Sequence, residues 1–263
     1  MGDVIKRFVV MGLLVAPMWA QQPDKGANVD LIAVRAANKE MRYTDAEALM
    51  LKDTALTPES SLMWIELGTA ELGLKKYTEA ETAFKKAIGI DPATQKIMHG
   101  EDFYTAEDSG STHASRNVVG HTVPSNQKLS PEIVGAAYSS LGEIYARTKK
   151  TEQAQAAWDA AAKTNPAKAA LYLGNETIIF YQEGNAEAQV SAAEKAIVAD
   201  PSRAVLYYFK GQGLASKATV DAQTQRLIAP PGCLEAYKKY LELEPKGQFS
   251  AEAKEMIAAV ASK

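Results

Sequence analysis

The sequence predicts an all-α protein, a solenoid in which one helical hairpin is repeated along the chain. Residues 64–92 read as helix, turn and helix, with small and large apolar side chains at helical spacing. The same residue types return at the same spacing in residues 138–166. The chain has 263 residues, of which 46% are hydrophobic and 23% charged. This is enough for a globular protein with a continuous stack of hairpins.

The first 20 residues are interpreted as a secretory signal peptide. Lys6 and Arg7 precede a short apolar run at residues 8–19, and a polar segment follows. Cleavage after Ala20 fits this pattern except at Met18, where a small residue is usual, and an N-terminal core helix is the alternative. The run is shorter than the roughly 20 residues that span a bilayer, and no other stretch could cross one. We therefore expect a mature chain, residues 21–262, that forms a single domain in the periplasm or outside the cell.

The best-defined hairpin lies at residues 61–94. Trp64, Leu67 and Gly68 are three and four residues apart, so they share one face of the first helix. Phe84 lies on the second helix and can enter the gap that Gly68 leaves. Pro92 then ends the second helix, because proline disfavours helical geometry in the residue before it.

This pattern resembles the tetratricopeptide repeat, a helix–turn–helix unit of 34 residues. The residues that carry the resemblance in two units are Trp64, Leu67, Gly68, Tyr77, Ala80, Phe84, Ala87 and Pro92, and then Tyr138, Leu141, Gly142, Tyr145, Ala154, Trp158, Ala161 and Pro166. The one clear departure in the first of these units is Glu71, where the family prefers a bulky residue, and neighbouring Leu72 can compensate. The resemblance implies a right-handed α-solenoid in which each repeat packs only on its neighbours.

The division of the chain follows from this repeat. Repeats are expected at about 27–60, 61–94, 135–168, 170–203 and 204–247, with a long irregular insertion at 95–134 and a C-terminal capping helix at 250–261. The first repeat is degraded, as terminal repeats often are. In the fourth, Thr177 stands where the family has glycine, and Gln189 where it has alanine. The fifth contains ten extra residues that could form a short β-hairpin within 217–232.

The insertion is the segment where an alternative function could reside. It is rich in Gly, Ser, Thr and Asn and holds all three histidines of the chain, His99, His113 and His121. Imidazoles and carboxylates are suitable metal ligands, but these histidines lack the short helical spacing that would preorganise a site. We expect a solvated segment with no metal site and no cofactor. An envelope enzyme or a metal-binding protein with its site in this insertion stays the alternative.

Charge and motifs exclude other function classes. The formal net charge of -3 gives no basic surface of the kind that nucleic-acid binders need. The single cysteine, Cys233, excludes an intrachain disulfide and a cysteine-cluster metal site, and is expected to be a small buried packing residue. The sequence contains no phosphate-binding glycine loop and no nucleophile motif. We therefore expect no enzymatic activity.

The resemblance also implies where a partner binds, because the stacked first helices of such repeats line an extended concave groove. The free face of these helices, here called the predicted groove face, comprises Leu62, Ile65, Thr69, Leu72, Ala136, Ser139, Glu143, Ala146, Leu171, Gly174, Ile178, Tyr181, Val205, Tyr208, Gln212 and Ala215. Only Glu143 is charged. The face therefore suits an apolar or uncharged extended segment or helix rather than an acidic C-terminus.

The predicted function is a non-enzymatic protein–protein interaction scaffold or adaptor of the cell envelope that binds a protein or peptide segment. The residues expected to contact the partner are Leu62, Ile65, Thr69, Ser139, Glu143, Asn175, Ile178, Tyr181, Tyr208 and Gln212. Tyr181 and Tyr208 lie in adjacent repeats, and tyrosines are frequent binding hot spots. Asn175 and Gln212 could pair with the ligand backbone. The alternatives are burial of this face by the C-terminal helix or the insertion, and self-association of the chain.

Overall fold

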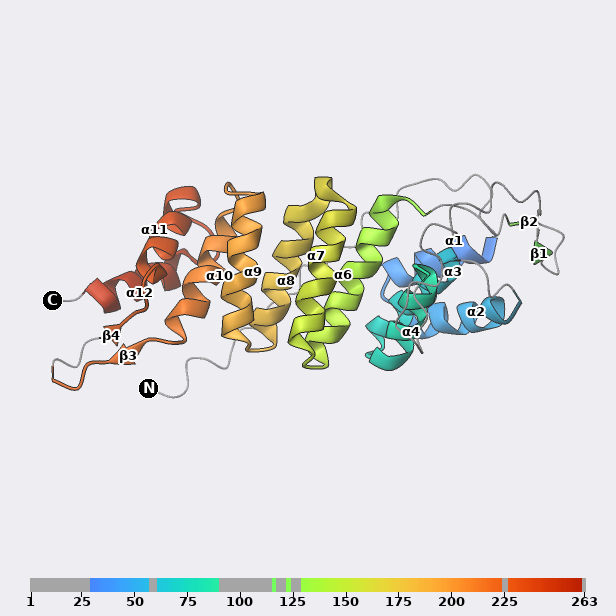
Figure 1. Cartoon of the computed structure of the whole chain (residues 1–263), viewed down its shortest axis with the longest axis horizontal. Helices are drawn as coiled ribbons and strands as arrows, with labels where there is room; N and C mark the ends of the chain where they lie inside the picture. Colours follow the sequence, from blue (N-terminus) through green and yellow to red (C-terminus); the bar gives the residue numbers. More distant parts are fainter. Residues whose placement is uncertain are drawn as a thin grey trace.

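The computed structural model describes residues 29–56, 61–89, 115–116, 122–123, 129–223 and 227–261. The helices there form consecutive hairpins that follow one another in sequence order along the longest axis of the molecule (Figure 1). The hairpins are α1 (Val29–Lys39) with α2 (Tyr43–Leu56), α3 (Ser61–Gly73) with α4 (Tyr77–Ala87), α6 (Pro131–Arg147) with α7 (Thr151–Thr164), α8 (Ala169–Gln182) with α9 (Ala186–Ala199), and α10 (Ala204–Ala215) with α11 (Cys233–Leu243). The helix α12 (Ser250–Ala261) ends the row beside α11. The predicted all-α solenoid is confirmed.

The other regular elements in the described part of the chain are short. A 3₁₀ turn, η2 (Pro166–Lys168), leads into α8. The strand β1 (Ser115–Arg116) pairs antiparallel with β2 (Thr122–Val123), and β3 (Thr219–Val220) pairs in the same way with β4 (Leu227–Ile228). The second pair lies between α10 and α11, where the sequence pattern placed a hairpin. Among the described residues, no helix combines the length and apolar character needed to cross a membrane.

Each of three hairpins is closed by an aromatic ring that packs on a glycine. A methyl group built on Gly68 would lie 3.1 Å from the Phe84 ring, and one built on Gly142 would lie 2.6 Å from Cδ2 of Trp158. These two contacts agree with the packing that the residue spacing predicted. Tyr237 packs on a glycine of α10 in the same way. Glycine at these sites therefore allows the two helix backbones to approach each other closely.

The turns inside the hairpins share one backbone geometry. Met41, Lys75 and Lys149 each adopt positive φ, at 59°, 61° and 64°, and Gly184 has φ of 69° at the matching place in the next hairpin. The amide after each of these residues donates back across the helix end, as from Lys76 N to the Glu71 carbonyl at 2.8 Å. This is the Schellman arrangement, which normally has glycine at the left-handed residue. Three of the four turns therefore hold a side chain in a conformation that favours glycine.

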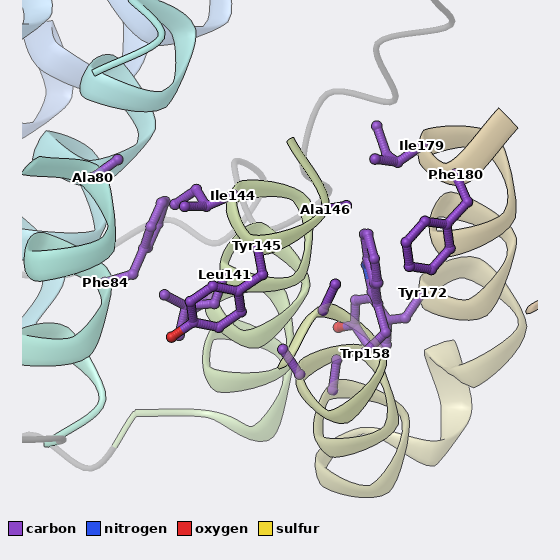
Figure 2. Close-up of a cluster of buried hydrophobic side chains, with 14 of the residues drawn as sticks. Ala80, Phe84, Leu141, Ile144, Tyr145, Ala146, Trp158, Tyr172, Ile179 and Phe180 are labelled. Atoms are coloured by element: carbon purple, nitrogen blue, oxygen red, sulfur yellow. The ribbon is translucent and has the colours of Figure 1, made fainter. Parts of the chain in front are cut away.

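The stack continues across the long gap in sequence between α4 and α6. Figure 2 shows Phe84 of α4 facing Leu141 and Ile144 of α6, and all three are buried in one apolar cluster. Tyr145 of α6 adds a polar link, because its hydroxyl donates to Oε1 of Glu81 at 3.2 Å. The second and third repeats are therefore direct neighbours in space.

Most of the predicted insertion, including its three histidines, lies outside the described residues. Its last residues are described and start the next helix. Ser130 caps α6, since its hydroxyl accepts a hydrogen bond from the Ile133 amide at 3.3 Å, and Pro131 occupies the first turn. Leu129, just before this cap, is buried. The cap and Leu129 therefore define the point at which the chain rejoins the stack.

The two substituted positions of the fourth repeat are occupied by buried, hydrogen-bonded side chains. The Thr177 hydroxyl donates to the Leu173 carbonyl at 3.0 Å. The Gln189 amide nitrogen donates to the Phe209 carbonyl and to Oε1 of Gln212, both at 2.7 Å. Gln189 thus joins α9 to α10, and both buried polar groups keep the partners that burial requires.

Candidate functional site

The ten residues expected to contact a partner lie on four first helices, α3, α6, α8 and α10. Eight of them are partly exposed, namely Leu62, Thr69, Ser139, Glu143, Asn175, Ile178, Tyr181 and Gln212. Ile65 and Tyr208 are buried, with 3% and 2% of their surface exposed. The partly exposed residues continue from one first helix to the next because consecutive hairpins pack on one another.

The prediction of partner contacts is therefore wrong for Ile65 and Tyr208. Ile65 belongs to the apolar cluster that joins the second repeat to the third. Tyr208 is covered by Phe249, with the two rings stacked at 4.0 Å between centroids and an interplanar angle of 9°. Phe249 lies just before α12, so the C-terminal part of the chain covers this end of the predicted groove face. Neither side chain has the free surface that the prediction required.

Some polar residues of the face are engaged within the protein. The Ser139 hydroxyl accepts a hydrogen bond from Nε1 of Trp158 at 3.1 Å, and the Thr69 hydroxyl donates to the Ile65 carbonyl at 2.8 Å. Gln212 accepts the bond from Gln189 described above. Ser139 therefore supports the hairpin packing, because a buried indole N–H needs an acceptor.

Glu143 is neutralised by a neighbour that the sequence interpretation overlooked. Arg147, one turn further along α6, pairs with Glu143 at 2.8 Å and with Glu183 at 3.2 Å. Lys149 also pairs with Glu183, at 2.7 Å. The Glu143–Arg147 spacing of four residues is the usual one for ion pairs on a helix, so the pair could have been found from the sequence. This part of the face carries balanced charge.

The C-terminal end of the face is an aromatic cluster. Tyr181 lies 5.0 Å from Phe209, and Phe209 lies 5.5 Å from Tyr208, between ring centroids. Burial, together with the nearby carboxylate of Glu252 on α12, raises the pKa of Tyr208. Burial, with the charge of Glu252 added, raises the pKa of Tyr181. Glu252 was not among the predicted residues. Phe249 and Glu252 are three residues apart, as Val205 and Tyr208 of the predicted groove face are, and this spacing was the signal in the sequence that could have indicated Glu252.

Two buried carboxylates of the stack, Glu71 and Glu176, have raised pKa values. Glu71 is 6% exposed, and its Oε2 atom has no hydrogen-bond partner among the described residues. Burial, together with the charges of Glu47 and Glu79, raises the Glu71 pKa to about 7. Burial also raises the pKa of Glu176 to about 7, against the opposing effect of Lys195. Glu71 is the residue at which the second repeat departs from the family pattern.

The described residues contain no group of three or more His, Cys, Asp or Glu side chains that could hold a metal ion. Cys233 is buried, with its sulfur 3.5 Å from the Gly211 carbonyl, and burial raises the pKa of its thiol. It occupies a packing position against α10, as expected. The histidine-containing alternative lies outside the described residues.

Comparison with known proteins gives one family and a set of similar folds. The family model of the tetratricopeptide repeat matches residues 62–94, and no curated protein matches the sequence. The fold is similar to that of YrrB, described as a TPR protein with an unusual peptide-binding site, at 15% identity over 91% of this chain and 98% of that chain, with a TM-score of 0.50. It is also similar to MamA from Desulfovibrio magneticus RS-1, at 15% identity over 84% of this chain and 98% of that chain, with a TM-score of 0.50. The family model therefore identifies a tetratricopeptide repeat at residues 62–94, and the glycine–aromatic packing of that repeat recurs in other hairpins of the stack.

Proposed function

We propose that this protein is a non-enzymatic interaction scaffold that binds an extended or helical segment of a partner protein along the first helices α3, α6, α8 and α10. The observation that carries the proposal is the continuity of partly exposed, uncharged side chains along this face, including Leu62, Ile178 and Tyr181. A solenoid of stacked hairpins presents such a surface over several repeats at once. It can therefore hold a segment longer than a single repeat could.

The chemistry of the face favours an uncharged central part of the bound segment. Glu143 is balanced by Arg147, so it offers no free charge there. Asn175 makes no side-chain hydrogen bond among the described residues, and its amide is available to a ligand backbone, whose polar groups would otherwise lose water without compensation. The description of YrrB as having a peptide-binding site supports the class of ligand.

We place this function in the cell envelope, on the strength of the N-terminal sequence alone. Lys6 and Arg7, followed by the apolar run at residues 8–19, are typical of an export signal. N-terminal sequencing of the envelope fraction should recover a chain that begins near Gln21. Recovery of an intact Met1 from the cytosol would contradict export.

The binding face can be tested with two substitutions and one control. The mature chain is used to capture a partner from envelope extract, and the affinity is then measured by calorimetry with the purified partner. Tyr181→Ala and Ile178→Ala should each weaken binding by about 1–3 kcal/mol, because both remove apolar contact area. Val198→Ala is the control, since Val198 on α9 is 85% exposed and lies outside the first helices. The helical signal in circular dichroism should stay unchanged in all three variants.

A deletion distinguishes this proposal from the alternative function in the insertion. Removal of residues 95–128 should leave the affinity for the captured partner unchanged if the first helices bind it. If the deletion abolishes binding while Tyr181→Ala and Ile178→Ala keep full affinity, the insertion is the binding segment and the proposal is wrong.

A further inference from the structure

The C-terminal helix brings a carboxylate to the aromatic end of the first-helix face. Glu252 lies in the first turn of α12, with its carboxylate close enough to the Tyr208 hydroxyl to add to the effect of burial on the pKa of Tyr208. Phe249, three residues earlier, is stacked on the Tyr208 ring. Glu252 therefore continues the line of first-helix residues beyond α10 and adds a charge to a face that is otherwise uncharged or neutralised.

The aromatic side chains around Glu252 hold one another in place. Tyr208 packs against Tyr237 at 6.0 Å and against Tyr240 at 5.6 Å, in addition to Phe249. The Phe249 amide donates to the Tyr240 hydroxyl at 2.9 Å, which fixes the segment that leads into α12. Tyr181 lies at the edge of this cluster and keeps part of its surface exposed. A ligand group that reaches Glu252 would therefore meet a preorganised aromatic surface.

The charge of Glu252 is not balanced within the described part of the protein. No lysine or arginine there forms an ion pair with it, whereas Glu143 and Glu183 share Arg147. The Tyr208 hydroxyl can fill at most one acceptor position of this carboxylate, and a carboxylate has about four. Glu252 thus retains acceptor capacity on a partly exposed surface.

We propose that Glu252 and the Tyr181 ring form a subsite for a lysine or arginine side chain of the bound segment. This inference rests on the proposed function, because it assigns the chemistry of one end of the same face. A cation beside an aromatic ring and a carboxylate gains both a charge–quadrupole attraction and a charge-assisted hydrogen bond. The bound segment would therefore combine an uncharged stretch along α3 and α6 with a basic residue between Tyr181 of α8 and Glu252 of α12.

The probe for the test is a displayed library of random 12-residue peptides, selected on the full mature chain. The expected outcome is a set of binders with lysine or arginine recurring at one position. Substitution of that residue by norleucine or citrulline, which removes the charge and keeps the length, should weaken binding about tenfold. This arm uses the unaltered protein, so it does not depend on the folding of a variant.

The protein arm of the test uses Glu252→Gln with Glu255→Gln as its matched control. Glu255 lies on the same helix, one turn further along, and is exposed. Glu252→Gln should weaken binding of the basic peptide about tenfold and leave the affinity for its norleucine or citrulline form unchanged. Glu255→Gln should change neither affinity. Tyr181→Leu should weaken binding of the basic peptide. Tyr181→Phe should bind this peptide as tightly as the unaltered protein does, because the ring rather than the hydroxyl contacts the cation.

Two outcomes would overturn the inference, and they differ in what else they overturn. If selected peptides lose affinity with Ile178→Ala but bind Glu252→Gln as tightly as the unaltered protein, the basic subsite is wrong and the binding face stands. If no peptide is selected, or if selected peptides ignore Ile178→Ala and Tyr181→Ala, the proposed function fails together with the subsite.

Discussion

Gly142→Ala should destabilise the protein, although alanine is the better helix former. The added methyl group would lie 2.6 Å from Cδ2 and 2.8 Å from Cε2 of Trp158, where carbon atoms normally stay about 3.5–4.0 Å apart. Trp158 is fully buried, and it is held by its hydrogen bond to Ser139 and by an edge contact with Phe180 at 5.6 Å. The ring therefore cannot move by the required distance, roughly 1 Å, without losing other contacts.

The expected magnitude follows from two opposed effects. Overpacking of a core costs about 1–3 kcal/mol, and the change from glycine to alanine inside a helix gains about 1 kcal/mol. The short distance at Gly142 places the overpacking cost in the upper part of its range, so the net loss should be about 1–2 kcal/mol. At Gly68 the added methyl group would lie 3.1 Å from the nearest Phe84 atoms. Gly68→Ala should therefore destabilise the protein by about 1 kcal/mol less than Gly142→Ala does.

The assay is urea unfolding followed by circular dichroism for both alanine variants, and for Gly142→Ala in a Trp158→Phe background. The smaller ring should relieve the clash, so the cost of Gly142→Ala should fall by at least about 1 kcal/mol there. A Gly142→Ala variant as stable as the unaltered protein, or an equal cost in both backgrounds, would refute the packing argument.

Three further predictions concern buried and strained groups. Because burial raises the folded-state pKa of Glu71 to about 7, the folded state favours its neutral form. Stability should therefore fall as pH rises from about 4.5 to about 7, and Glu71→Gln should make thermal melts at pH 5 and pH 8 more alike, with the remaining difference due to Glu176. Met41→Gly should raise the melting temperature, because Met41 is 58% exposed and has φ of 59°. Relief of this left-handed strain is worth about 0.5–1 kcal/mol. The control, Ala48→Gly at an exposed helical site of α2, should lower the melting temperature. Cys233 should react with a thiol reagent only after unfolding, and rapid labelling of the native protein would contradict its burial.

The sequence predicted the hairpins well because their packing is local. The pairs Gly68–Phe84 and Gly142–Trp158 lie within one repeat, and helical spacing alone decides which side chains face each other. The same spacing put Tyr208 on a free face, but its cover, Phe249, arrives from beyond the next helix. That contact depends on how α12 docks, which residue spacing within one repeat does not specify.

Buried charges were the other feature that the sequence did not disclose. Glu66 of α3 is fully buried and is matched by Arg35 at 2.8 Å and by Asn38 Nδ2 at 2.9 Å, both from α1. Residue type alone gives no sign of this burial, because charged and amide side chains are rarely buried without partners. Only the docking of α1 on α3 brings these partners together. Polar pairs between repeats therefore require the stacking geometry.

Because α4 packs directly on α6, the connection between these two helices is a suitable site for inserting another sequence. Glu81 on α4 accepts hydrogen bonds from both Tyr145 and Lys150, and Phe84 meets Leu141, so the two ends of the connecting segment are held in place by contacts outside it. The entropy of closing a flexible loop between fixed ends rises slowly, by about 0.6 kcal/mol for each doubling of its length. A peptide or a small domain added to this connection would therefore cost little additional closure entropy. Such a chimera would carry the added module at a defined point along the stack of helices.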